Sequence, residues 1–144
     1  MKNKILSFLF LFTSLLSQAQ TKVNGITFPD TYTAGKDKLV FNGAGTREKY
    51  WMDMYVGGLY LTAKSKDAAA IVAANTSMMA RLNIVSGLIT SSKMSEAVGE
   101  GFKKSTGGNT EPIKDKIAQF QKAFLEPIKV GDIFEIAYTA EKVS

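Results

Sequence analysis

Residues 50–61 constrain the fold more than any other part of the sequence. Apolar and aromatic side chains stand on both alternating faces of this segment. A strand of that composition must be covered on both sides, so the sequence predicts a buried strand. Gly57 and Gly58 remove side chains at its centre, which predicts a bend or a close approach of other backbone. One face carries Trp51, Tyr55, Leu59 and Leu61, and the other face carries Met52, Met54, Val56 and Tyr60.

Periodicity predicts the remaining elements. Residues 77–85 alternate as a strand, and residues 91–104 carry apolar side chains at helical spacing. A third helix is expected after Thr110, which can cap it, with Ile113, Ile117, Phe120 and Phe124 on one stripe. We also expect short strands at 23–28, 39–41 and 133–139, a helix at 66–74 capped by Ser65, and a glycine-rich turn at 42–46. This order predicts an α+β class, with helices on one face of a largely antiparallel sheet.

The first 19 residues have the pattern of an export signal. Lys2 and Lys4 precede an apolar run over residues 5–16, and small residues follow at Ser17 and Ala19. The run is shorter than the ~20 residues of a membrane span. We therefore expect cleavage after Ala19, a periplasmic or secreted location, and no integral membrane segment in the remaining domain of residues 20–144.

Composition excludes several kinds of chemistry. The chain has no cysteine and no histidine, so thiol nucleophiles, disulfides, imidazole bases and the metal sites built on them are ruled out. No glycine-rich phosphate loop is present, and we expect neither a cofactor nor a metal. The net charge of +5 falls to +3 when Lys2 and Lys4 leave with the signal. The remaining lysines are scattered, so no nucleic-acid partner is expected.

Two residues are the main candidates for binding. Arg47 follows the glycine-rich segment and could hold a carboxylate or carbonyl oxygen bidentately; the alternative is a surface arginine paired with Glu48 or Asp53. Tyr55 lies in the long strand and could share an anionic ligand with Arg47. Its alternative is a core tyrosine with its hydroxyl bonded to backbone.

Other polar residues give weaker signals. Arg81 and Asn83 share one face of the strand at 77–85, and they could point inward or lie on an exposed edge. Glu96 and Glu100 stand one helical turn apart on the polar side of their helix, where we expect them to be solvated. No catalytic pair is therefore predicted.

Two motifs together resemble the chalcone isomerase-like family, and its exported bacterial members in particular. They are Asn-Gly-Ala-Gly-Thr-Arg at residues 42–47 and Met-Tyr-Val-Gly-Gly-Leu-Tyr-Leu at residues 54–61. The similarity extends to Phe28 and Pro29 before them and to the Lys-Val-Gly-Asp turn at 129–132. The resemblance implies an open-faced β-sandwich, in which a large antiparallel sheet is backed by a layer of helices, with the ligand cleft between them.

The resemblance also implies roles for the two candidates. In the plant enzymes the arginine matching Arg47 positions a chalcone for ring closure, and in lipid-binding relatives it holds a fatty-acid carboxylate. The enzymes carry threonine where this chain has Tyr55, whereas the fatty-acid-binding relatives carry tyrosine. The enzymes' later tyrosine and asparagine contacts have no match around residues 86–99.

The resemblance therefore favours a non-catalytic binder of a fatty acid or a similar apolar carboxylate, held by Arg47 and Tyr55. The alternative is an isomerase of the chalcone isomerase type (an intramolecular lyase) acting on a small phenolic or enone substrate. A third reading is an envelope protein with a vestigial cleft. The family further implies elements beyond the strand at 133–139, usually a strand and a helix. Because the chain stops at Ser144, we expect a fragment or a trimmed fold.

Overall fold

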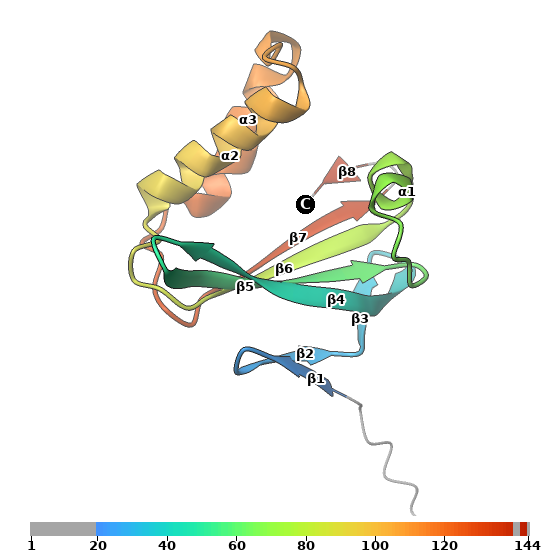
Figure 1. The fold of residues 1–144 in the computed structure, drawn as a ribbon. Helices are drawn as coiled ribbons and strands as arrows, with labels where there is room; N and C mark the ends of the chain where they lie inside the picture. Colours follow the sequence, from blue (N-terminus) through green and yellow to red (C-terminus); the bar gives the residue numbers. More distant parts are fainter. Residues whose placement is uncertain (1–19, 140–141, 144) are drawn as a thin grey trace, which may run out of the picture.

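A six-stranded antiparallel sheet forms the body of the molecule (Figure 1). The computed structural model describes residues 20–139 and 142–143, so the expected signal segment at 1–19 lies outside the described residues. The strand order is β3-β4-β5-β6-β7-β8, and a separate hairpin pairs β1 with β2. The strands are Gln20–Val23 (β1), Ile26–Pro29 (β2), Thr31–Ala34 (β3), Asp37–Lys49 (β4), Met52–Leu61 (β5), Met78–Ile84 (β6), Ile133–Thr139 (β7) and Lys142–Val143 (β8).

Three α-helices lie on the opposite side of this sheet from the β1–β2 hairpin (Figure 1). They are Ala68–Ala73 (α1), Ser91–Ser105 (α2) and Lys114–Gln121 (α3), and the 3-10 turns Glu111–Ile113 (η1) and Lys122–Phe124 (η2) flank α3. The arrangement confirms the predicted α+β class. Among the described residues, no helix has the length and hydrophobicity needed to cross a bilayer.

Two of the residues predicted to cap helices do not do so. Asp67, not Ser65, caps α1, because its side chain accepts the Ala70 backbone N–H at 3.0 Å. Thr90 accepts the Lys93 N–H at the start of α2. Thr110 precedes the 3-10 turn η1 without a capping hydrogen bond from its side chain, so its predicted role as a cap is wrong.

One core fills the space between the β1–β2 hairpin and the sheet. Phe28 of the hairpin is fully buried and stacks on Phe41 with ring centroids 5.4 Å apart. The Tyr60 hydroxyl donates to the Pro29 carbonyl at 2.8 Å, which satisfies its polar tip at the edge of this core. The cluster of buried residues comprises Phe28, Ala34, Leu39, Phe41, Val56, Tyr60 and Met79.

A second core joins α2 and α3 to one end of the sheet. Met94 and Val98 on the predicted stripe of α2 pack here with Phe120 and Phe124. Phe102 and Phe120 meet edge to face at 5.9 Å and hold the two helices together. These members of the two predicted stripes therefore face this core. Its buried members are Met54, Ile84, Ile89, Met94 and Phe124.

One predicted turn and one predicted strand are wrong, because the two hairpins of the chain reverse at other residues than expected. The glycine-rich residues 42–46 lie inside the 13-residue strand β4. The chain reverses instead at Tyr50 and Trp51, so these two residues are exposed and do not belong to the buried strand predicted over residues 50–61. The segment 23–28, predicted as one strand, is a hairpin that turns at Asn24 and Gly25, with φ of 44° and 80°. Asn-Gly is a strong signal for a tight hairpin turn, whereas Tyr-Trp is not.

Candidate functional site

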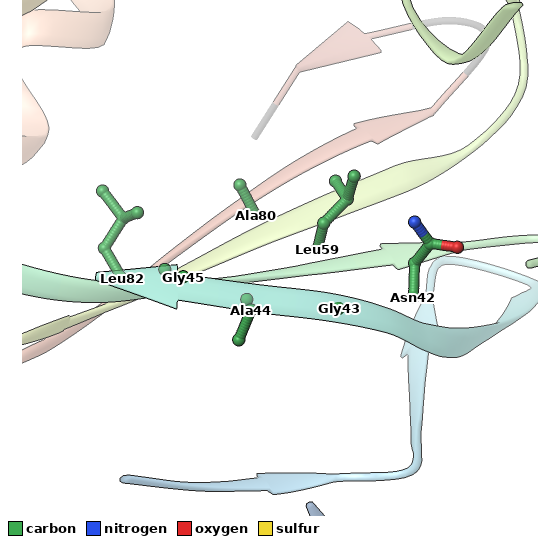
Figure 2. Close-up of a pocket in the computed structure, with 9 residues that line it drawn as sticks. Asn42, Gly43, Ala44, Gly45, Leu59, Ala80 and Leu82 are labelled. Atoms are coloured by element: carbon green, nitrogen blue, oxygen red, sulfur yellow. The ribbon is translucent and has the colours of Figure 1, made fainter. Parts of the chain in front are cut away.

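An open groove follows the helix-bearing face of the sheet across β4, β5 and β6 (Figure 2). Its volume is about 410 Å³. Leu59, Ala80 and Leu82 project to the groove side in Figure 2, while Ala44 projects to the opposite side. The lining is therefore mostly apolar. It comprises Asn42, Gly43, Ala44, Gly45, Gly57, Gly58, Leu59, Ala80 and Leu82.

Glycines keep the base of the groove open. Gly43 pairs with Leu59, and Gly45 pairs with Gly57, across β4 and β5. A Cβ atom added at Gly43 or Gly45 would have no heavy atom within 4 Å. At Gly57 the nearest atoms would be Cδ2 of Leu82 at 3.4 Å and Cε2 of Tyr55 at 3.6 Å. The hollow thus exists because side chains are missing from this part of both strands.

Arg47 and Tyr55 lie at one end of this groove. They pair directly across β4 and β5, one same-face step beyond the Gly45–Gly57 pair. Opposed residues of this kind have Cβ atoms about 4.5–5.5 Å apart and share a face of the sheet. The Tyr55 ring leans toward Gly57, and so toward the groove. The hairpin register therefore brings together the two residues that the sequence singled out.

In the described part of the chain, neither the Arg47 guanidinium nor the Tyr55 hydroxyl has a protein partner. Arg47 is exposed and Tyr55 is half-buried against the helix–sheet core. Among the residues that the structure describes, no hydrogen bond or ion pair joins either side chain to a protein group. The Asp53 carboxylate, one alternative partner of Arg47, accepts from Asn24 Nδ2 at 2.7 Å instead. The guanidinium and the phenol hydroxyl are both free to bind a ligand.

Arg81 and Asn83 point to the other face, toward the β1–β2 hairpin. Arg81 Nη1 lies 2.8 Å from Glu135 Oε1, and the Tyr32 hydroxyl donates to Glu135 Oε2 at 2.6 Å. This hydrogen bond and burial raise the pKa of Tyr32. Asn83 is buried and Nδ2 donates to the Val56 carbonyl at 3.4 Å. These groups connect strands and lie outside the groove.

The remaining polar candidates lie at the surface. Glu96 and Glu100 are both exposed on α2, as predicted.

The periodicity did not predict a second hollow beneath α1. It has a volume of about 200 Å³ and includes Leu61, Met78 and Ile71 in its lining. Leu61 pairs with Met78, and Leu59 pairs with Ala80 one same-face step earlier. The second hollow therefore continues the line of the groove along β5 and β6. The alternation of apolar residues in both strands could have indicated this line, but the position of α1 could not.

Comparisons with known proteins identify the fold and the family. A solved structure of a fatty-acid binding protein from Arabidopsis thaliana has a similar fold, with a TM-score of 0.59 and 19% sequence identity. The match covers 84% of this chain and 73% of that protein. A comparison with curated protein sequences found no match. The family model described as chalcone isomerase-like matches residues 20–143, and the chain belongs to this family.

Proposed function

We propose that the protein binds a fatty acid or a similar apolar carboxylate in the groove. One observation carries the proposal: Arg47 and Tyr55, whose polar groups have no protein partners among the described residues, pair directly across β4 and β5 at the end of an apolar groove. The carboxylate accepts hydrogen bonds from Arg47 and Tyr55, and charge-assisted bonds of this kind are among the stronger ones in proteins. The apolar tail covers the glycines, Leu59 and Ala80. The neighbouring plant structure, a fatty-acid binding protein by name, supports the same reading.

The dimensions of the face favour a long acyl chain. Four cross-strand rows share this face, from Tyr55 opposite Ile84 to Leu61 opposite Met78. Leu61 lies six positions after Tyr55, which is roughly 20 Å along a strand. A carboxylate held at Arg47 therefore leaves room for an extended tail that passes the groove and enters the hollow beneath α1. We also propose that residues 1–19 direct export, so that the ligand is met outside the cytoplasm.

Substitution of the two polar residues tests the proposal. We expect Arg47→Ala to weaken binding of a long-chain fatty acid about ten- to a hundredfold, because a hydrogen bond to a charged group contributes ~1.5–3 kcal/mol. Tyr55→Phe removes only the hydroxyl, and we expect it to weaken binding by up to about tenfold. Isothermal titration calorimetry measures both affinities.

Lys22→Ala is the matched control, since Lys22 is an exposed cation on β1, on the opposite side of the sheet. Its affinity for the fatty acid should equal that of the wild type. An Arg47→Ala protein with unchanged affinity would exclude the proposed carboxylate site. Turnover of a chalcone in an absorbance assay would instead favour an isomerase.

A further inference from the structure

Exposed apolar residues are concentrated at the end of the sheet where β4 turns into β5, β6 ends and β7 begins. This end of the ribbon lies at the left of Figure 1. Of the eight large apolar residues that the described part of the chain leaves exposed, six lie here. Backbone hydrogen bonds tie the segments together, because Val85 N–H donates to the Met54 carbonyl and Gly131 N–H donates to the Ile84 carbonyl. We call the six residues the apolar end. They are Tyr50, Trp51, Met52, Leu88, Val130 and Ile133.

The β4–β5 turn forms the most prominent part of this apolar end. Trp51 is 99% exposed and Tyr50 is 70% exposed. Both residues have left-handed backbone, with φ of 53° for Tyr50 and 59° for Trp51. Bulky L-residues rarely adopt this conformation, and such strain is often kept where a side chain has a function. The turn thus holds two large aromatic side chains in water at a conformational cost.

The β1–β2 hairpin gives an internal comparison. It also reverses through two consecutive residues with positive φ, and there the residues are Asn24 and Gly25. Asn-Gly is the ordinary solution for this turn. The chain therefore uses the relaxed pair at one hairpin, and it places Tyr50 and Trp51 at the other.

We propose that the apolar end docks on the surface of a lipid bilayer, with Tyr50 and Trp51 inserted at the level of the headgroups. Tyrosine and tryptophan combine an apolar ring with a polar tip and are the side chains enriched at that depth. Arg47 and Lys49 lie directly behind them on β4, where long cationic side chains can reach lipid phosphates. The Lys49 ammonium already lies 5.2 Å from the centroid of the Tyr50 ring.

Shape and charge favour a bilayer over a protein partner. Trp51 is 99% exposed, so its side chain protrudes from the surface. A specific protein interface is instead a broad patch that buries about 800 Å² on each partner. Arg47 and Lys49 are balanced by Glu48 and Asp53 in the same hairpin. Docking should therefore depend on insertion of apolar rings. It should change little with salt and should not require anionic lipid.

Trp51 is the only tryptophan of the chain, so its fluorescence reports the proposed contact directly. The experiment uses the chain from Gln20 onward, which contains every described strand and helix. Phosphatidylcholine vesicles, with or without phosphatidylglycerol, should shift the emission to shorter wavelength and protect Trp51 from an aqueous quencher. No shift with either kind of vesicle would overturn the proposal. A shift without lipid that grows with protein concentration would assign the apolar end to a second copy and would also overturn it.

Co-sedimentation with vesicles tests which residues are responsible. The double variant Tyr50→Asn/Trp51→Gly copies the relaxed turn at Asn24 and Gly25, so it should fold normally. We expect it to bind vesicles roughly tenfold more weakly or worse, because the two inserted rings are lost. Val72→Ser is the matched control, since Val72 is 86% exposed on α1 away from this end, and it should sediment like the wild type. Equal sedimentation of the double variant and the wild type would contradict the proposal.

Discussion

Replacement of Gly45 by leucine is expected to abolish binding of long-chain carboxylates while the protein remains folded. A Cβ at this position meets no heavy atom within 4 Å, so the new side chain enters the groove and not the core. Backbone strain is not expected, because Gly45 is not among the glycines with positive φ. A leucine side chain there occupies the path of the ligand tail beside Gly57 and Leu82. Isothermal titration should show no measurable binding, and circular dichroism should show the wild-type spectrum.

Gly101→Leu is the control for this substitution. Gly101 lies exposed on α2, and a Cβ atom added there would also meet no heavy atom within 4 Å. Leucine there should raise helix stability by somewhat less than about 0.8–1 kcal/mol, the difference between glycine and alanine, and leave the affinity unchanged. Wild-type affinity in a folded Gly45→Leu protein would show that the ligand does not use this groove.

Replacement of Gly58 by alanine is expected to destabilise the fold itself. The added methyl group would lie 2.5 Å from Cε1 and 2.6 Å from Cδ1 of Phe28. Phe28 is fully buried and stacked on Phe41, so its ring has little room to move. Overpacking of this kind costs about 1–3 kcal/mol. Urea titration should give a lower midpoint with an unchanged slope.

A double-mutant cycle identifies the cause of this loss. Phe28→Leu removes the ring atoms that the new methyl group would strike. In that background Gly58→Ala should cost clearly less than in the wild type, which gives a coupling energy between the two sites. Strictly additive effects would mean that the Phe28 ring is not the obstacle.

The main layers of the fold could be predicted because periodicity reports burial. The alternation over residues 77–85 and the helical spacing over residues 91–104 correspond to β6 and α2. The Gly57–Gly58 pair predicts a bend or a close approach of other backbone, but the group that approaches Gly58 is the side-chain ring of Phe28. These patterns depend only on which face of an element meets a core, so they do not require knowledge of the tertiary contacts.

The turn between β4 and β5 could not be predicted from the same signals. Glycines at 43 and 45 indicated a turn, but both have extended backbone in β4, where they open a groove. The real turn uses Tyr50 and Trp51, which local preferences disfavour. Because the turn was predicted at the wrong residues, the pairing between β4 and β5 could not be predicted either. Only with the reversal at Tyr50 and Trp51 does Arg47 stand directly opposite Tyr55.

Comparison of a long-chain fatty acid with the alcohol of the same chain length tests the central claim most directly. Both ligands offer the same tail to the groove, and only the acid offers a carboxylate to Arg47 and Tyr55. In the wild type we predict at least about tenfold tighter binding of the acid by isothermal titration, and in Arg47→Ala we predict that this preference disappears. Equal affinities for acid and alcohol in the wild type, or a preference that survives in Arg47→Ala, would contradict the account.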